Sequence, residues 1–328
     1  MINLNKDSII YLLCPSKHFT GGPLALHQLG HKLNKMGFKV RMFYIPVIEN
    51  PINDKFLLYN IPYTFQINDD SNNLLIAPET LTRYLFDYKH IKKAIWWLSI
   101  DNFFKSTIRN KIGRFLGVIR KFKFKDGYKY YHFAQSRYAF EFLKSKSNLD
   151  NDKLYMLSDY LLEDFLKPIS HKTTQKEDIV LYNPKKGYEF TQKLIQNSIN
   201  EYRWFPIENM TPTQVKNMLL KSKLYVDFGK HPGKDRFPRE AAVCGCCIIT
   251  GKKGSAGFYE DMPIPDEFKF INNESEIENI LEKIRIVMQD YESEHTKFTK
   301  YIDEIKGQET IFENEIKDIF KLETAKDE

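Results

Sequence analysis

The chain has 328 residues, a length that suits two domains of ordinary size. Hydrophobic residues make up 42% of it and charged residues 28%, which excludes a disordered chain and indicates globular cores. No apolar run reaches the roughly 18 residues of a membrane span, and the N-terminal residues lack the pattern of a signal peptide. We therefore expect a cytoplasmic protein.

The positive charge is concentrated in one stretch. The chain carries a net charge of +6. Within 105–129, "KSTIRNKIGRFLGVIRKFKFKDGYK", Asp126 is the only acid among many Lys and Arg residues. This pattern favours an anionic partner, which could be a phosphate-bearing substrate, a lipid headgroup or a nucleic acid.

Strands and helices are predicted to alternate along the first half. Apolar runs rich in β-branched and aromatic residues predict strands at 8–16, 38–46, 72–79, 92–102, 130–136 and 153–161. Helical periodicity predicts helices at 20–37, 80–90 and 137–147. This order is typical of βαβ units and of a parallel sheet.

The alternation starts again after a polar segment, 163–178, which is the best linker in the chain. Strands are expected at 179–184, 202–209, 223–229 and 246–250, and helices at 188–198, 211–222 and 238–245. Residues 273–323 are charged and helical in pattern. The sequence thus predicts an α/β protein of two Rossmann-like parallel-sheet domains that face a cleft, with ligands at the carboxyl ends of the strands.

The expected domains have the following bounds. Residues 1–165 would form an N-terminal Rossmann-like domain, and residues 170–290 a C-terminal Rossmann-like domain. Residues 291–328 would form C-terminal helices that could cross back to the N-terminal domain.

The cysteines are expected to be structural. Three of the four lie in "VCGCC", at Cys244, Cys246 and Cys247. Near neighbours on one strand cannot easily pair with one another, and no second ligand pair for zinc is present. We interpret them as small buried apolar residues in a reducing compartment.

Several motifs of the second half resemble the family-4-like group of GT-B-fold glycosyltransferases. The stretch "EAAVCGCCII", from Glu240 to Ile249, is similar to the second part of the motif E-x7-E followed by A-M-A-C-G-C-P-V-V. "NPKKG", 183–187, resembles the Lys-Gly motif on the phosphate side. "TGGPLALHQLGHKLNKMGFKV" in the first half resembles the Gly-Gly loop and helix.

The resemblance implies roles for individual residues. Glu240 would accept hydrogen bonds from the ribose hydroxyls, Lys185 or Lys186 would bind the diphosphate, and Gly21 and Gly22 would let the backbone approach phosphate. A carboxylate can accept both hydroxyls of a diol, and a Gly-rich helix start presents free N–H groups to phosphate.

The sequence departs from the family pattern at one position. The first acid of E-x7-E, which helps to hold the donor sugar, falls at Pro232. Asp235 or Asp227 could substitute for it. Lys234 and Arg236 make this loop basic and suited to a diphosphate.

Three residues at predicted strand ends or loops of the first half are candidates for catalysis. Asp101 and Glu79 each end a strand, and His18 precedes the Gly pair. An inverting enzyme needs a base there to take the proton of the acceptor hydroxyl, whereas a retaining enzyme does not. Asp101 and Glu79 could instead cap the segments that follow them.

Two interpretations of 105–129 remain open. Phe104, Ile108, Ile112, Phe115 and Ile119 recur at helical spacing. The segment could be an amphipathic helix packed on its own domain, or a helix on the inner face of the membrane that meets a lipid-linked acceptor. We expect no nucleic-acid partner, since no recognised module surrounds the stretch.

These observations predict a glycosyltransferase that uses a nucleotide diphosphate-sugar and a glycan or lipid-linked acceptor, in bacterial surface polysaccharide synthesis. No cofactor is expected, and basic groups rather than a metal would stabilise the leaving diphosphate. The alternatives are a nucleotide-sugar epimerase with the same fold, and a degenerate transferase that only binds glycan or a protein partner.

Overall fold

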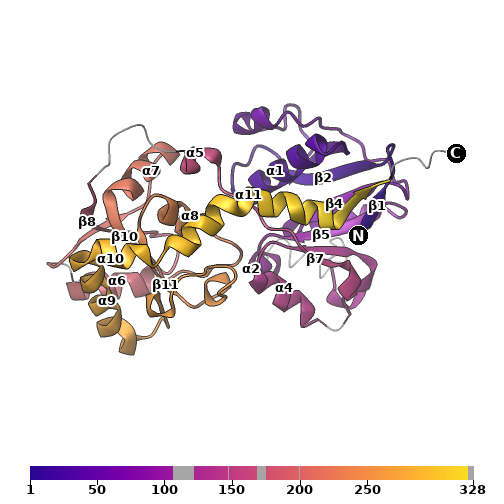
Figure 1. Cartoon of the computed structure of the whole chain (residues 1–328). Coiled ribbons are helices and arrows are strands. Elements are labelled where there is room, and N and C mark those ends of the chain that lie inside the picture. Colours follow the sequence, from indigo (N-terminus) through magenta and orange to yellow (C-terminus); the bar gives the residue numbers. More distant parts are fainter. Residues whose placement is uncertain (106–121, 147, 168–174, 199, 324–328) are drawn as a thin grey trace. The chain divides into compact units, whose positions relative to one another are not determined.

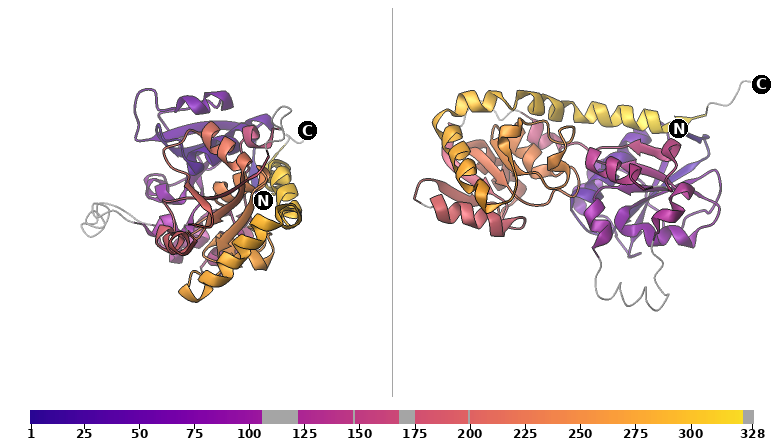
Figure 2. Two further views of the ribbon diagram at one scale, coloured as in Figure 1. Left: turned by 90° about the vertical axis from the view of Figure 1, so that its left-hand side faces the viewer. Right: turned by 90° about the horizontal axis from the view of Figure 1, so that it is seen from below.

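The chain folds into two compact units (Figure 1). The computed structural model describes residues 1–105, 122–146, 148–167, 175–198 and 200–323. Met1–Asp159 and the chain from Thr310 onward form the first unit, and Tyr160–Glu309 form the second. The division falls inside α11 (Thr299–Ile319), which Figure 2 shows as a single long helix. The last described residues therefore belong to the same unit as the first.

The first unit contains a six-stranded parallel sheet with the order β3-β2-β4-β5-β6-β7. The strands are β2 (Ile9–Pro15), β3 (Lys39–Ile45), β4 (Leu74–Pro78), β5 (Lys92–Trp97), β6 (Tyr131–Ala134) and β7 (Leu154–Met156). The α-helices are α1 (Gly21–Lys35), α2 (Ile100–Phe104) and α4 (Arg137–Lys144). Short 3-10 helices are η1 (Asp54–Tyr59), η2 (Glu79–Asp87), η3 (Phe124–Lys129) and η4 (Asn151–Lys153).

The central strands of this sheet are apolar because both of their faces are covered. All five residues of β4 are buried, as are the last four of β5. Continuous apolar runs of this kind are typical of parallel strands between helical layers. Gly37, with φ of +90°, follows α1 in the left-handed conformation that ends many helices.

A separate two-stranded parallel ladder joins the two ends of the described chain. β1 (Ile2–Leu4) pairs with β13 (Phe320–Leu322), Ile2 lying opposite Phe320. Lys32 of α1 also forms an ion pair of 2.6 Å with Glu313 of α11. The end of α11 is therefore fixed to the first unit by backbone and side-chain contacts.

The second unit contains a five-stranded parallel sheet with the order β12-β11-β10-β8-β9. The strands are β8 (Glu177–Tyr182), β9 (Arg203–Pro206), β10 (Ser222–Asp227), β11 (Cys247–Gly251) and β12 (Lys269–Phe270). The α-helices are α5 (Glu163–Leu166), α6 (Tyr188–Ser198), α7 (Pro212–Lys221), α8 (Arg236–Val243), α9 (Ile277–Gln289) and α10 (Tyr291–Thr296). Short 3-10 helices are η5 (Ser255–Gly257), η6 (Asp266–Phe268) and η7 (Glu274–Glu276).

The two parallel sheets confirm the predicted pair of Rossmann-like domains. One predicted helix is wrong in type, because residues 80–90 form most of the 3-10 helix η2 rather than an α-helix. The segment predicted as a linker, 163–178, begins with the short helix α5 and ends in β8, and the division between units lies earlier, after Asp159.

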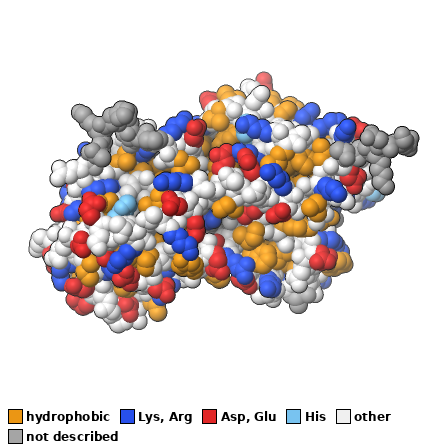
Figure 3. Space-filling model, in the orientation of Figure 1, with side chains coloured by type: hydrophobic (Ala, Val, Ile, Leu, Met, Phe, Trp, Pro, Cys, Tyr) orange, Lys and Arg blue, Asp and Glu red, His pale blue; other side chains and the backbone are white. Residues whose placement is uncertain are grey.

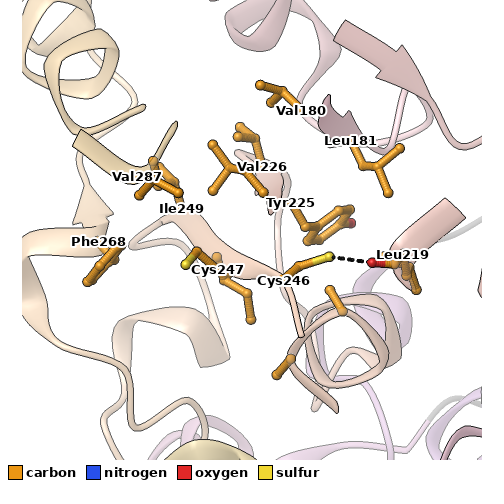
Figure 4. Close-up of a cluster of buried hydrophobic side chains, with 14 of the residues drawn as sticks. Val180, Leu181, Leu219, Tyr225, Val226, Cys246, Cys247, Ile249, Phe268 and Val287 are labelled. Atoms are coloured by element: carbon orange, nitrogen blue, oxygen red, sulfur yellow. Dashed lines mark hydrogen bonds between the residues drawn. The ribbon is translucent and has the colours of Figure 1, made fainter. Parts of the chain in front are cut away.

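The four cysteines are buried, as predicted, and all are free thiols: Cys14 lies in β2 of the first unit, and Cys244, Cys246 and Cys247 lie in the core of the second. Figure 4 shows Cys246 and Cys247 among apolar side chains of β8, β10 and α9, with the Cys246 Sγ directed at the Leu219 carbonyl. Burial raises the pKa of Cys246 to about 11. These thiols are protonated at neutral pH, which agrees with a packing role.

No helix in the described part of the chain is long and apolar enough to cross a membrane. On the face drawn in Figure 3, Lys and Arg side chains are interspersed with Asp and Glu. Most of the basic stretch 105–129, namely residues 106–121, lies outside the described residues, so the membrane-surface helix stays a prediction.

Candidate functional site

The candidate site lies at the carboxyl edge of the second sheet, beside β8. From β8 the chain passes to β9 on one side, and it later returns to β10 on the other. The helices consequently cover opposite faces: α6 contacts α9, whereas α7 contacts α8. In open α/β sheets ligands bind at such a switch point, so the loops after β8 and β10 are the expected binding loops.

A buried polar network joins these two loops. Lys186, in the loop after β8, places its ammonium 2.7 Å from Asp235 Oδ2, in the loop that precedes α8. The same Asp235 oxygen lies 3.2 Å from Nδ1 of His231, whose Nε2 lies 3.7 Å from Asp227 Oδ1 at the end of β10. Thr250 of β11 places its hydroxyl oxygen 3.3 Å from His231 Nε2.

The acidic and basic groups of this network stabilise one another's charged forms. Burial by itself would lower the pKa of His231, but the carboxylates of Asp235 and Asp227 outweigh it and raise that pKa. Burial by itself would raise the pKa of Asp235, but His231 and Lys186 outweigh it and lower that pKa. Both aspartates named as possible substitutes for the missing acid at Pro232 are thus paired with His231.

Glu240 differs from these carboxylates because it has no hydrogen-bond donor within the described residues. It lies in the middle of α8 and is 9% exposed. Burial raises its pKa, although the charges of Arg236 and Arg239 act against the rise. A buried carboxylate without a donor is costly, and a ligand hydroxyl would remove that cost.

The basic residues before α8 have different environments. Arg239 is fully buried and structural: its guanidinium donates to the carbonyls of Lys234 and Asp235 and to Gln308 Oε1, at 2.8, 3.2 and 2.8 Å. These bonds fix the backbone of the loop that carries Lys234 and Asp235. Lys234 and Arg236 are themselves partly exposed.

The loop after β8 requires glycine at Gly187. Its φ is +64°, and a Cβ there would collide with the carbonyl of Phe228, after β10. The two loops are therefore packed backbone against backbone. Lys185, in the same loop, is exposed and lines a pocket of about 710 Å³.

In the first unit, the Gly pair stands at the first positions of α1. A Cβ on Gly21 would meet no atom within 4 Å, and one on Gly22 would meet only Leu98, at 3.5 Å. The fold alone thus does not demand glycine at either position, which is compatible with close approach of a ligand. His18 is exposed in the preceding loop.

The two acidic candidates of the first unit differ in accessibility. Glu79 is 4% exposed, and its Oε2 accepts the backbone N–H of Leu98 at 3.1 Å. Burial raises its pKa to about 8, against backbone N–H donors that lower it. Asp101, in α2, is half-buried and accepts a 3.2 Å hydrogen bond from the Tyr138 hydroxyl. Asp101 is the better placed of the two to meet a substrate.

Sequence reasoning missed two residues beside the candidate site, Lys230 and Asn272, which line the same pocket as Lys185. Each follows the end of a strand, β10 for Lys230 and β12 for Asn272. A polar residue directly after a predicted strand end is the sequence feature that could have identified Lys230 and Asn272.

No family model and no curated protein sequence matches the chain. The chain does, however, match several solved structures. HepE of Anabaena, in complex with UDP and glucose, superposes with a TM-score of 0.64 at 11% identity, covering 95% of this chain and 98% of HepE. Sucrose-phosphate synthase of Thermosynechococcus elongatus gives a TM-score of 0.62 at 12% identity, with coverage of 95% and 98%. A glycosyltransferase of Rickettsia africae gives 0.55 at 11%, with coverage of 96% and 94%.

These neighbours are GT-B glycosyltransferases, and they extend over nearly the whole chain. At such low identity the similarity shows the fold and not the activity. The chain therefore has the GT-B fold, with two Rossmann-like domains, as the sequence predicted.

Proposed function

We propose that the protein is a glycosyltransferase that moves a sugar from a nucleotide diphosphate donor to a hydroxyl group of an acceptor. The observation that carries this proposal is Glu240, a buried carboxylate that receives no hydrogen bond from the described residues and lies at a switch point of a GT-B fold. A ribose supplies two hydroxyl donors for such a group. HepE, the structural neighbour with UDP and glucose, supports UDP as the nucleotide to test first.

In the proposed reaction the acceptor oxygen forms a bond to the anomeric carbon while the bond from that carbon to the diphosphate oxygen breaks. Lys186, with the basic loop of Lys234 and Arg236, would stabilise the negative charge on the leaving diphosphate. In an inverting reaction Asp101 would receive the proton of the acceptor hydroxyl. The proposal includes no metal, because these cations supply the charge.

We further propose that the acceptor is a glycan or lipid-linked saccharide of a bacterial surface polysaccharide, and that the protein acts in the cytoplasm at the inner face of the membrane. The basic composition of 105–129 supports this part of the proposal. Vesicles with and without anionic lipid would test it in a sedimentation assay.

The first experiment is a thermal-shift panel of UDP, GDP, ADP and CMP and their sugars on the wild type, Glu240→Ala and Glu240→Gln. One nucleotide should raise the melting temperature of the wild type and lose most of its effect in both variants. A wild-type protein unaffected by every nucleotide would refute the transferase proposal. Turnover abolished by EDTA and restored by Mg²⁺ would refute the proposed metal independence. Release of free nucleotide without acceptor would favour the epimerase.

A further inference from the structure

A second basic region lies at the carboxyl edge of the second sheet, on the side that α6 covers. The pocket of about 710 Å³ is lined by the N-terminal part of α6 and by the segments that follow β8, β10, β11 and β12. Its lining does not include Lys186, Asp235 or Glu240. Because α6 and α8 cover opposite faces of the sheet, this pocket is distinct from the surroundings of Glu240.

The charges in the pocket are unbalanced. Lys185, Lys193, Lys230 and Lys253 line it, with Glu189 as the one acidic lining residue. Lys193 forms an ion pair with Glu274. The other three ammonium groups have no acidic partner within the described residues. Like charges gathered in a concave site repel one another, and a bound anion of charge two or more would relieve that repulsion.

Asn272 holds one wall of the pocket in place. Its Nδ2 donates to the Phe228 carbonyl at 2.6 Å, which fixes the orientation of the amide. Its Oδ1 is buried against Gly251, so the side chain shapes the wall without offering an acceptor to a ligand.

An aromatic surface completes the wall. Tyr188, the first residue of α6, is 41% exposed and lines the pocket. Its ring lies nearly parallel to that of Tyr182, with 6.2 Å between the centroids and 13° between the planes, so it is supported from behind. Rigid aromatic walls with a few polar groups are typical of small-molecule sites of this size.

We propose that this pocket binds a phosphorylated saccharide as a second ligand, separate from the nucleotide donor. Three of the lysines, Lys185, Lys230 and Lys253, provide for a dianionic phosphate, and the exposed ring of Tyr188 provides a surface for a sugar ring. The pocket is also larger than a free phosphate requires. The proposal does not depend on the proposed function, because it concerns binding and can be tested without turnover.

The test is isothermal titration of the full chain with glucose 1-phosphate, inorganic phosphate and UDP, each separately, and with glucose 1-phosphate in the presence of saturating UDP. The test variant is Lys230→Glu/Lys253→Glu. The control is Lys252→Glu, which reverses the charge of one exposed lysine next to Lys253 that does not line the pocket, and each single variant, Lys230→Glu and Lys253→Glu, is compared with it. Tyr188→Ala tests the saccharide part.

Glucose 1-phosphate should bind the wild type with or without UDP. The double variant should weaken its binding at least about tenfold and leave UDP binding unchanged, while the control changes it less than about threefold. Tyr188→Ala should weaken the binding of glucose 1-phosphate but not that of inorganic phosphate.

Three results would overturn the proposal. The wild type could fail to bind glucose 1-phosphate. UDP could displace it and the double variant could lose both ligands, which would make the pocket the donor site. Inorganic phosphate could bind as tightly as glucose 1-phosphate, which would exclude a saccharide site. A chain that binds glucose 1-phosphate but no nucleotide would refute the proposed function and leave this proposal standing.

Discussion

The ammonium of Lys186 lies 2.7 Å from Asp235 Oδ2, and this ion pair joins the loop after β8 to the loop before α8. The loops that would hold a ligand at the switch point are thus fixed relative to each other before any ligand binds. Preorganisation of this kind lowers the entropic cost of binding.

The first prediction concerns this pair. Lys186→Met and Asp235→Asn should each weaken nucleotide binding, and the double variant should weaken it by less than the sum of the two. A coupling energy of about 1 kcal/mol is expected for contacting residues. Titration of the four proteins with the nucleotide found in the thermal-shift panel measures it. Strict additivity would show that Lys186 and Asp235 act independently.

The second prediction is a pH dependence that originates in His231. A raised pKa in the folded state means that His231 contributes stability fully below its unfolded pKa, near 6.5, and loses it as the pH rises through the folded value. Asp235 has a lowered pKa, so its contribution is present above its unfolded value of 3.8 and is lost only in acid.

Wild type and His231→Asn should therefore differ most in free energy of unfolding near pH 5.5 to 6.5, and the difference should shrink at higher pH. Urea unfolding at several pH values between about 5 and 9 measures it. A difference that stays constant over this range would mean that the pKa of His231 is the same in the folded and unfolded states, which would contradict the raised pKa. The groups that face the imidazole are Asp227 and Thr250 from the sheet, with Asp235 and Lys186 from the loops.

The third prediction concerns Lys176, whose buried ammonium donates to the carbonyls of Leu219, Ser222 and Cys244 at 3.0, 2.9 and 2.8 Å. Lys176→Met should lower the free energy of unfolding by about 2 kcal/mol, because it removes a charged donor from three carbonyls, two of which keep only the weak donor Cys246 Sγ among side chains. Lys221→Met, at an exposed residue that ends α7, is the control and should change it by about 0.5 kcal/mol or less. Equal effects would contradict the structural role of Lys176.

The fourth prediction compares two glycines. Gly187→Ala should destabilise the protein by more than about 1 kcal/mol and weaken nucleotide binding, since φ is +64° and the methyl group meets Phe228. Gly307→Ala, in the interior of α11 with nothing within 4 Å of the added Cβ, should stabilise it by about 0.5 to 1 kcal/mol. Thermal and urea unfolding measure the stability of both variants. A Gly187→Ala variant as stable as the wild type would show that the loops after β8 and β10 can separate.

The sequence predicted most elements of the second unit because their signals are local. The strand of Cys247–Gly251 is a continuous apolar run, and α7 begins with the Thr-Pro start and Gln214 of a capping box. The 3-10 helix η2 was predicted wrongly, as an α-helix. At its first residue the Glu79 side chain bonds to the backbone of Leu98, a contact that no local pattern reveals.

The sequence by itself determined the two parallel-sheet domains and the burial of the cysteines, since periodicity and motif order are properties of neighbouring residues. Only the tertiary structure decided that Asp227 and Asp235 both lie beside His231, and that β1 pairs with β13. It also decided that Lys186 pairs with Asp235, whereas the neighbouring Lys185 lines the pocket. These relationships depend on contacts between segments far apart in the chain, and such contacts form only when the strands are aligned and the helices have packed on opposite faces of the sheet.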